Sequence, residues 1–337
     1  MWAAADLEHV GACPFCGSGS RQLGYEGVRD WSFHTAPGSW NYWECSECGS
    51  LFLDPRPTRE SIGRAYGTYY THGQSALGAL ASLKARLRNE FLSQQLGADL
   101  TPRIRSGPWR LLLRPWRRLV RVPFELRELA RLSPGSLMDV GCGSGGLLRI
   151  AKALHWKVLG LEIDPAALAP ARAAGLEVIE GSYEALAQFE NAFDCIVCSH
   201  VLEHVHSPSD LLTTLAGALK EGGALILSLP NASSAMRRRF GAHWRGLEAP
   251  RHISIPSSVQ LRRLLQEHGL PVVRTGAQRG HAATAAESMR IRRRGLTISR
   301  LDRLGAWVVR RTAGPLSAET SDFIEFVCEK RRDGDAQ

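Results

Sequence analysis

The residues most able to do chemistry form a glycine-rich loop near the middle of the chain. The apolar run from Leu137 to Val140 is typical of a buried strand, and it leads directly into Gly141, Gly143 and Gly145. Glycine has no Cβ and accepts positive φ, so such a loop brings bare backbone close to a ligand. A tight turn without a ligand would use the same residues. The loop lacks the lysine of a phosphate-binding loop.

Two acidic residues narrow the choice of ligand. A second apolar run, residues 157–163, carries Glu162 at its end, 21 residues after Gly141. An acid at this distance is placed to accept hydrogen bonds from ribose hydroxyls in a βαβ nucleotide fold. Asp139 would repel a pyrophosphate but suits a cationic amino-acid ligand. The pattern therefore favours S-adenosylmethionine over NAD.

Eight cysteines are present, and four of them stand in two C-x-x-C pairs that are each followed by glycine: Cys13, Cys16, Cys45 and Cys48. Two such pairs supply a tetrahedral set of thiolates suited to zinc. Disulfides are the alternative, and a cytosolic chain disfavours them. With four thiolates the zinc site would be closed and structural. The remaining cysteines are predicted core thiols: Cys142, Cys195, Cys198 and Cys328.

Candidate acid–base groups occur in two places. His200, Glu203 and His204 stand at i, i+3 and i+4, so they would share one face of a helix. They match the inverted zinc-peptidase motif, but a loop beyond a strand is the wrong context for that enzyme. The alternative role for Glu203 and His204 is to brace the loop. A second segment, residues 244–252, ends in His252.

An acceptor that must lose a proton needs a base in hydrogen-bonding reach. The candidates for this catalytic role are His252, as first choice, with His200 and His204. The alternative for His252 is a hydrogen-bonded residue that fixes its loop.

Alternating apolar runs and helical segments predict an α/β fold. The predicted strands are bounded by turns and buried on both faces, which indicates a mainly parallel sheet. We expect strands near residues 136–140, 157–162, 176–180, 193–198, 224–229, 270–277 and 322–328.

Three motifs in order resemble those of class I S-adenosylmethionine-dependent methyltransferases: DVGCGSG, GLEID and FDCIVCSHVLEHV. The resemblance covers roughly residues 132–330. It implies a Rossmann-like seven-stranded, mostly parallel sheet with helices on both faces. Residues 51–72 and 244–252 resemble segments of a bacterial subgroup with an N-terminal zinc ribbon, many of which act in polysaccharide, lipid or secondary-metabolite pathways.

The resemblance also assigns roles to residues around the cofactor. Asp139 and the loop glycines would line its methionine end, and Glu162 would hold the ribose. Family members often place an acid after the third strand against the adenine, and here Ser182 stands at that place. The predicted cofactor-binding residues are Asp139, Gly141, Gly143, Gly145, Glu162, Ser182 and Ser199.

The predicted organisation has three parts: a zinc ribbon over residues 1–54, a linker and basic helical cap over 55–132, and the methyltransferase domain over 133–330. In the linker, Tyr66, Tyr69, Tyr70 and His72 would either approach the cofactor pocket or pack at the domain junction.

The segment Arg103–Arg121 is rich in arginine and tryptophan and has no acidic residue. Three interpretations are open: contact with an anionic membrane surface, binding to RNA, or a cap helix with solvated arginines. A second basic stretch, Arg290–Arg311, is predicted to be an inserted helical piece.

Composition sets wide bounds on partners and location. The chain has 337 residues and a net charge of +9, which suggests an anionic partner. No apolar run is long enough for a transmembrane helix, and the N-terminus lacks the basic region of a signal peptide. We therefore expect a cytoplasmic protein, with peripheral attachment at the inner membrane surface as an option.

Three functional hypotheses follow. The first is methylation of an oxygen or carbon of a small or carrier-linked acceptor, such as a sugar, lipid or secondary metabolite. The second is a ribosomal RNA base methyltransferase with a zinc-ribbon RNA-binding module, although the N-P-P-[YF] motif of exocyclic amine methylation is absent after the fourth predicted strand. The third, an inactive binding module, is disfavoured by the intact cofactor motifs.

Overall fold

The structure is a computed structural model, and it describes most of the chain: residues 2–67, 79–102, 104, 115, 120–276, 281–312, 317, 319–332 and 334. The chain divides into two compact units. Unit 1 comprises Met1–Tyr69, His200–Ala216 and Leu227–Arg331, and unit 2 comprises Tyr70–Ser199, Gly217–Ile226 and Arg332–Gln337.

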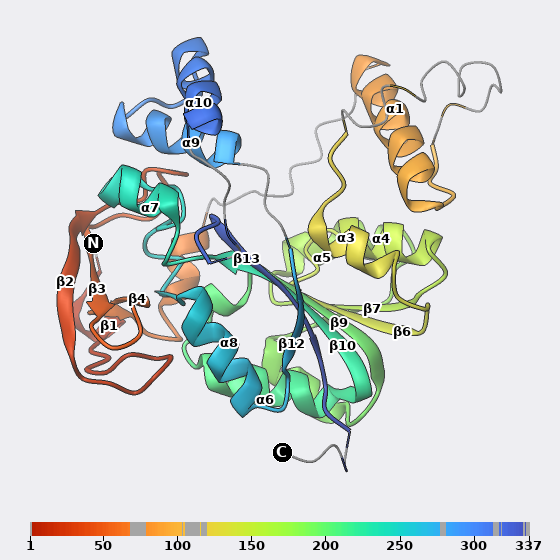
Figure 1. Cartoon of the computed structure of the whole chain (residues 1–337), viewed down its shortest axis with the longest axis horizontal. Helices are drawn as coiled ribbons and strands as arrows, with labels where there is room; N and C mark the ends of the chain where they lie inside the picture. Colours follow the sequence, from red (N-terminus) through yellow and green to blue (C-terminus); the bar gives the residue numbers. More distant parts are fainter. Residues whose placement is uncertain are drawn as a thin grey trace. The chain divides into compact units, whose positions relative to one another are not determined.

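Seven strands form one sheet in the order β12-β13-β10-β9-β6-β7-β8 (Figure 1). β6 pairs in parallel with β7 and β9, and β7 pairs in parallel with β8, whereas β12 and β13 pair antiparallel. The strands are β6 (Ser136–Val140), β7 (Lys157–Glu162), β8 (Val178–Glu180), β9 (Phe193–Ser199), β10 (Leu219–Pro230), β12 (Val272–Thr275) and β13 (Phe323–Glu329). A mostly parallel sheet with seven strands at the predicted positions confirms the predicted fold class.

The central strands are apolar because both of their faces are covered. Leu137 and Met138 of β6 are fully buried, as are Cys195 and Ile196 of β9. α4 (Gly146–Ala153) and α5 (Pro165–Ala173) pack on β7 and β8 of the same unit. Asp164 fixes the start of α5, because its side chain accepts a hydrogen bond from the backbone N–H of Ala166 at 2.8 Å.

The other helices are distributed over both units. α9 and α10 lie side by side (Figure 1) and confirm that the second basic stretch is largely helical. The helices are α1 (Ala79–Leu96), α3 (Phe124–Leu129), α6 (Pro208–Ala218), α7 (Ala235–Phe240), α8 (Ser258–Glu267), α9 (His281–Arg292) and α10 (Arg300–Thr312), with 3₁₀ turns η1 (Ala4–Asp6), η2 (Ile62–Tyr66), η4 (Tyr183–Gln188), η5 (Leu202–His204) and η6 (Gly241–His243).

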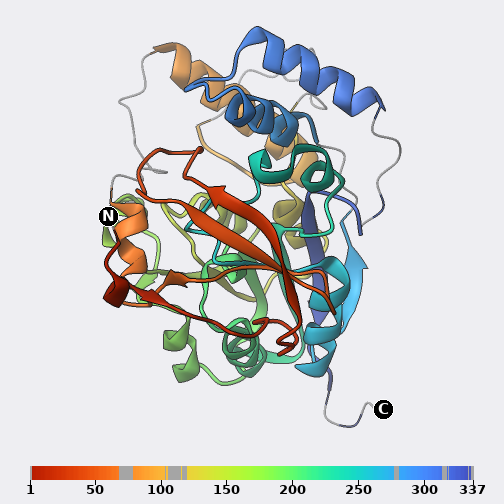
Figure 2. The same cartoon turned by 90° about the vertical axis from the view of Figure 1, so that its left-hand side faces the viewer.

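A second, antiparallel sheet lies in unit 1, with strand order β11-β4-β3-β2. Figure 2 shows β2 and β3 crossing this part of the molecule side by side. The strands are β2 (Arg21–Val28), β3 (Trp40–Cys45), β4 (Leu51–Leu53) and β11 (Ser254–Ile255), and a separate pair joins β1 (Leu7–Glu8) to β5 (Arg56–Pro57).

The pairing of β11 with β4 brings the C-terminal half of the chain into the sheet of the predicted zinc ribbon. Ser254 stands opposite Phe52 and Ile255 opposite Leu51. Tyr42, Leu51 and Trp244 belong to one buried cluster of this unit. The predicted boundaries at residues 54 and 132 stay predictions.

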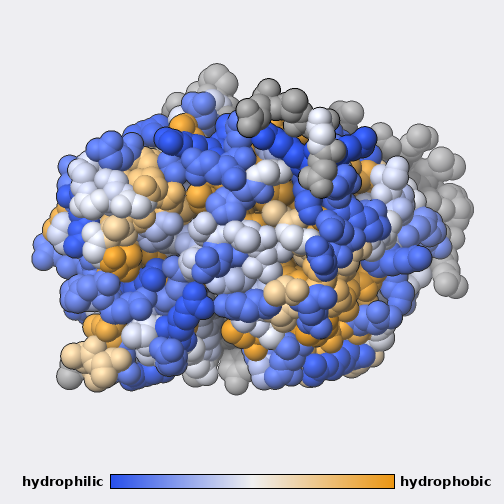
Figure 3. Space-filling view, turned by 90° about the horizontal axis from the view of Figure 1, so that it is seen from below, coloured by the Kyte–Doolittle hydropathy of each residue, from blue (hydrophilic) through white to orange (hydrophobic). Residues whose placement is uncertain are grey.

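Parts of the sequence discussed above lie outside the described residues. These are most of Arg103–Arg121, and Tyr69, Tyr70 and His72. On the face shown in Figure 3, apolar residues form several patches among hydrophilic ones. Within the described part of the chain, no helix combines the length and the apolar character needed to cross a membrane.

Candidate active site and metal centre

The glycine-rich loop, residues 141–146, follows β6 and leads into α4, and we call it the donor loop. Gly141, Gly143 and Gly145 all have positive φ, of 74°, 52° and 73°. At Gly145 the requirement is double, because a Cβ would also stand 2.4 Å from a methyl carbon of Leu176. The sequence therefore needs glycine here both for backbone conformation and for packing.

Glu162 lies at the end of β7 and binds the donor loop directly. Its carboxylate accepts a hydrogen bond from the N–H of Gly143 at 2.9 Å, and others from Ile163 and Asp164 at 2.9 and 3.0 Å. A carboxylate offers about four lone-pair positions, so one position on the oxygen that faces Gly143 is left for a ligand. This geometry is compatible with the predicted ribose contact.

Asp139 lies in a buried acidic environment. It is 5% exposed, and its carboxyl makes no hydrogen bond to any described residue. Burial, with the neighbouring charges of Glu125 and Glu162, raises the pKa of Asp139 to about 8. Asp139 is thus a buried carboxyl whose ionisation is opposed by two neighbouring acidic groups.

Glu125 was missed by the sequence analysis. It comes from α3 and accepts a hydrogen bond from the hydroxyl of Ser199 at 2.7 Å, which ties the end of β9 to the acidic group. Nothing in its local sequence marks it, because its position depends on how α3 packs. Ser182 follows β8, and its hydroxyl donates to Glu184 rather than to Glu162.

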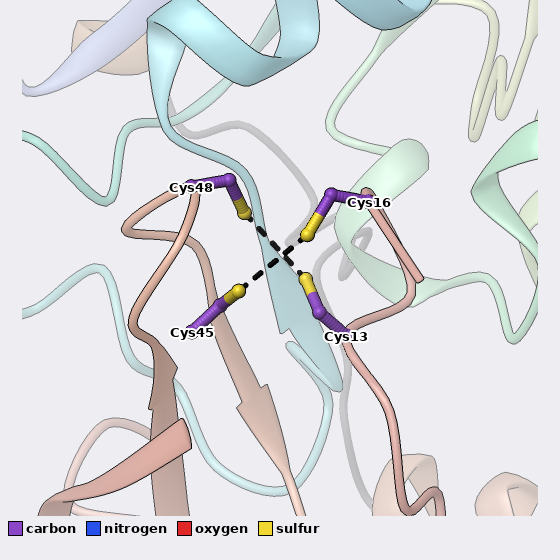
Figure 4. A group of neighbouring side chains, drawn as sticks. All are labelled: Cys13, Cys16, Cys45 and Cys48. Carbon is purple, nitrogen blue, oxygen red and sulfur yellow. Dashed lines mark hydrogen bonds between the residues drawn. The ribbon is translucent and has the colours of Figure 1, made fainter. Parts of the chain in front are cut away.

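The four cysteines of the N-terminal segment converge on one point (Figure 4). Sulfur atoms lie 3.6 Å apart in the pair Cys13–Cys48 and 3.5 Å apart in the pair Cys16–Cys45. Around a zinc ion with Zn–S bonds of about 2.3 Å, tetrahedral sulfurs stand roughly 3.8 Å apart. The set therefore fits a tetrahedral zinc ion.

Each C-x-x-C pair forms the same small turn. The N–H of Gly17 donates to the carbonyl of Cys13, and the N–H of Gly49 donates to that of Cys45, both at 2.9 Å. Hydrogen bonding to the Cys13 thiol and to Ser50 lowers the pKa of Cys48 to about 5. The same hydrogen bond raises the pKa of Cys13, because the two thiols share one proton.

The histidines and Glu203 meet in unit 1, and we call His200, Glu203, His204 and His252 the histidine cluster. His200 has a positive φ of 56° and a half-exposed ring. Its Nδ1 lies 3.1 Å from a carboxylate oxygen of Glu203, which is completely buried. With Nδ1–H donating to Glu203, the neutral ring carries its lone pair on Nε2.

His204 and His252 stack edge to face, with ring centroids 4.7 Å apart. Nδ1 of His204 lies 2.9 Å from the carbonyl oxygen of Arg251, and Nδ1 of His252 lies 2.8 Å from that of Gly246. Burial lowers the pKa of His252 to about 4, so this ring is neutral near pH 7. Tyr66 also reaches this group, because its hydroxyl lies 3.0 Å from Nδ1 of His204.

A buried ion-pair network holds the His252 segment. The guanidinium of Arg251 is fully buried and donates to Asp30 at 2.6 Å and to Glu248 at 3.1 Å. Tyr42 donates its hydroxyl to the carbonyl of His252 at 2.6 Å. Hydrogen bonds and charges on Arg251 hold the pKa of Asp30 well below its usual range, against the opposing effect of burial.

The predicted site residues thus fall into two groups. Asp139, the loop glycines and Glu162 lie together in unit 2, with Ser199 attached through Glu125. His200, His204 and His252 lie together in unit 1. The chain passes from one group to the other at the peptide bond between Ser199 and His200.

Comparison with known proteins matches a family model to the part of the chain that contains the donor loop. The family described as "Methyltransferase domain" matches residues 114–275. The chain therefore carries a methyltransferase domain of the S-adenosylmethionine-dependent class, as the sequence motifs predicted.

Curated relatives match a shorter stretch. The mitochondrial ubiquinone biosynthesis O-methyltransferase of Schizosaccharomyces pombe is 35% identical over 111 residues, which is 30% of this chain and 40% of that protein. The corresponding enzyme of Xylella fastidiosa is 37% identical over 112 residues, 31% of this chain and 45% of that protein. The chain thus spans less than half the length of these relatives.

Solved structures of similar fold have lower identity. An S-adenosylmethionine-dependent methyltransferase from Mesorhizobium loti has 17% identity and a TM-score of 0.43, covering 61% of this chain and 98% of that one. Another from Archaeoglobus fulgidus has 18% identity and a TM-score of 0.44, covering 66% and 100%.

Proposed function

We propose that the protein transfers the methyl group of S-adenosylmethionine to a hydroxyl of a small or carrier-linked acceptor. The observation that carries the proposal is the acidic group of Asp139, Glu125 and Glu162 beside the donor loop. Glu125 and Glu162 repel a pyrophosphate and attract the positive charges of the cofactor's methionine part, and a bound cation would favour the ionised form of Asp139 as well. The names of the relatives, O-methyltransferases of ubiquinone biosynthesis, favour oxygen as the methylated atom.

On the donor side, we assign Asp139, Gly141, Gly143 and Gly145 to the methionine end of the cofactor. Glu162 accepts from a ribose hydroxyl through its remaining lone pair. Ser199 belongs to this site through Glu125, to which it is hydrogen-bonded. We assign Ser182 to the adenine side of the cofactor. Its hydroxyl donates to Glu184 in an exposed hydrogen bond, which a bound ligand could replace.

On the acceptor side, His200 is the best-supported general base. Its ring is half-exposed, whereas His252 is only 5% exposed. In the transfer step the acceptor oxygen forms the new bond to the methyl carbon, and the bond from that carbon to sulfur breaks. Nε2 of His200 takes the hydroxyl proton, and S-adenosylhomocysteine leaves. Glu203 orients the ring, and His204 and His252 support this position.

In the N-terminal segment, we assign a structural zinc ion to Cys13, Cys16, Cys45 and Cys48. Four thiolates leave no open position, so this ion would stabilise the turns without entering the chemistry. The anionic partner indicated by the charge of the chain stays a proposal. A membrane surface would be contacted through Arg103–Arg121, and RNA would show steeply salt-dependent binding.

The donor assignment is tested by calorimetry with S-adenosylmethionine and S-adenosylhomocysteine. Glu162→Ala should weaken binding by roughly tenfold or more, because the ribose and the donor loop both lose an acceptor. Glu177→Ala removes an exposed carboxylate of the same unit and should leave the affinity unchanged. Equal affinities for the two variants would refute the pocket.

The acceptor is best found by comparing metabolites of wild-type and deletion strains by mass spectrometry. The expected signature is a hydroxylated compound lighter by one methylene group that accumulates in the deletion strain. His200→Asn should leave cofactor affinity intact while methyl transfer falls, on the order of 10²-fold for a lost general base.

A further inference from the structure

Exposed apolar side chains are concentrated in one part of the second basic stretch. Eleven large apolar side chains are exposed in the described part of the chain, and five of them lie within residues 296–308: Leu296, Leu301, Leu304, Trp307 and Val308. A single exposed apolar residue is normal on a protein surface, whereas a group of them marks a surface that binds a partner. Four of the five lie on one helix, α10.

One side of α10 packs against the rest of unit 1 and fixes how the helix lies. Asp302, Ala306 and Val309, at i, i+4 and i+7, are buried. Ala306 and Val309 belong to the same buried cluster as Tyr42 and Trp244. α10 and α9 lie in close contact (Figure 1). The exposed apolar residues therefore lie on the sides of α10 that are turned away from this cluster.

A capping box fixes the start of α10. The hydroxyl of Ser299 accepts from the backbone N–H of Asp302 at 3.1 Å, and the carboxylate of Asp302 accepts from the backbone N–H of Ser299 at 2.7 Å. Arg293 also donates to this carboxylate at 2.8 Å. The one acidic residue in the sequence of α10 is thus buried and paired. Because α10 is held at its start and along one side, its exposed apolar residues belong to the folded helix.

Two neighbouring stripes make up the exposed side of α10, and we call them together the α10 face. The first stripe is apolar and has the spacing i, i+3, i+7: Leu301, Leu304 and Val308. The second has the same spacing and combines two arginines with an indole: Arg300, Arg303 and Trp307. Leu301 is 76% exposed and Leu304 is 58% exposed. Leucines and a tryptophan beside arginines are typical of helices that lie in the interface of a membrane.

The charge around the α10 face selects an anionic partner. Residues 290–311 contain eight arginines and one aspartate, which gives a net charge of +7. Two copies that met through the α10 face would place arginines against arginines, with no exposed acid on the helix to offset them. Nucleic acid would suit the arginines but would leave the leucines in water. An anionic lipid surface suits both, because its headgroups neutralise the arginines and its acyl boundary accepts the leucines.

We propose that the α10 face binds an anionic membrane surface, with the helix lying in the headgroup region. The apolar stripe enters the acyl boundary, Trp307 lies at the level of the headgroups, and Arg300 and Arg303 pair with lipid phosphates. This contact is separate from the Arg103–Arg121 segment and does not depend on the methyl-transfer reaction.

The test is co-sedimentation of the full chain with lipid vesicles. Wild type should bind vesicles of equal parts phosphatidylglycerol and phosphatidylcholine roughly tenfold or more tightly than vesicles of phosphatidylcholine alone, and added salt should weaken this binding. The double variant Leu301→Gln, Leu304→Gln should bind the mixed vesicles roughly tenfold or more weakly, because two apolar side chains no longer enter the lipid. Arg300→Gln with Arg303→Gln should lower the preference for phosphatidylglycerol by roughly tenfold.

The matched control is Val259→Gln, which places the same amide at an exposed apolar position of α8 and should bind vesicles like wild type. Circular dichroism checks the fold of each variant, and S-adenosylmethionine binding tests the donor site separately on the same samples. The proposal is overturned if wild type does not sediment with the mixed vesicles. It is also overturned if Leu301→Gln, Leu304→Gln sediments equally well, since the contact would then lie in another segment.

Sedimentation velocity without lipid tests the other occupant of the α10 face, a second copy of the chain. Wild type should be the same size as Leu301→Gln, Leu304→Gln in this measurement. A wild-type dimer that the double variant does not form would assign the α10 face to contact between two copies and overturn the membrane proposal.

Discussion

In the donor loop, the contacts that fix the site join residues close in sequence, whereas the histidine cluster depends on contacts between distant segments. Gly143 and Glu162 are 19 residues apart: Gly143 lies in the loop after β6, and Glu162 ends β7, the strand paired in parallel with β6. Arg251 and Asp30 are 221 residues apart, and Tyr42 is 210 residues from His252. The donor site is thus built from backbone and strand order, and the histidine cluster from buried side-chain links across unit 1.

Because of this difference, we expect substitutions to affect the two sites in different ways. A substitution in the donor loop should change local conformation and cofactor affinity. A substitution among the links of unit 1 should instead cost global stability and disturb the histidines indirectly. Each prediction below contrasts the two regions, beginning with the largest expected effect.

Loss of the cysteine-bound ion should produce the largest effect, and it should fall on unit 1. Cys16→Ser should lose the metal and lower the free energy of unfolding by several kcal/mol, because structural zinc contributes on the order of 10 kcal/mol in small fingers. Ser257 donates to the carbonyl of Cys48 at 2.6 Å, so the strand before α8 should loosen as well. Hydrogen exchange should show lost protection in β3, β4 and β11 before any loss in β6 and β7.

The control for this experiment is Cys328→Ser, which changes a buried thiol in β13 away from the four-cysteine set. Metal analysis should find about one equivalent of zinc in the control and much less in Cys16→Ser. Full zinc content in Cys16→Ser would contradict the four-thiolate site.

The Arg251 network should give the next largest effect. Arg251→Met leaves Asp30 and Glu248 buried without their shared cation, and breaking a buried pair in this way costs about 3–5 kcal/mol. Arg263→Met removes an exposed arginine, paired with an exposed Glu267, and should change stability by less than about 0.5 kcal/mol. Urea denaturation measures both. If the two variants were equally stable, the histidine cluster would not depend on this link.

The same contrast explains what the sequence could predict. Asp139, the loop glycines and Glu162 were identifiable because their spacing follows from consecutive strands, and the cysteine pairs because both lie in one short segment. His252 was found only as a candidate, since Tyr42, which binds its carbonyl, and Asp30, which binds the adjacent Arg251, are far away in sequence. Glu125 and the pairing of β11 with β4 had no local signal at all, because tertiary packing alone creates them.

Two adjacent glycines test how far the donor loop depends on its backbone conformation. Gly145→Ala combines a positive φ with a Cβ 2.4 Å from Leu176, so it should destabilise unit 2 by about 1–3 kcal/mol. Gly146→Ala has open space around the new Cβ and begins α4, so it should be neutral or slightly stabilising. Thermal denaturation distinguishes them. A neutral Gly145→Ala would show that the loop tolerates a right-handed conformation.

Asp139 tests the donor side through a defined dependence of stability on pH. Its pKa is raised to about 8 in the folded protein, against about 3.9 for an unperturbed aspartate. Between these values the folded chain binds a proton that the unfolded chain has released. Stability should therefore fall as pH rises through this range, and Asp139→Asn should remove that contribution.

The cofactor adds a second consequence for Asp139. A cationic ligand favours the ionised carboxylate, so S-adenosylmethionine should displace the proton, and its affinity should rise with pH until about pH 8. Calorimetry at pH 7 in buffers of different ionisation enthalpy measures this release directly. The binding heat should differ between buffers for wild type, and much less for Asp139→Asn. Identical heats for wild type would mean that Asp139 does not face the charge of the cofactor. Glu162 and the backbone of the donor loop would then have to hold the donor.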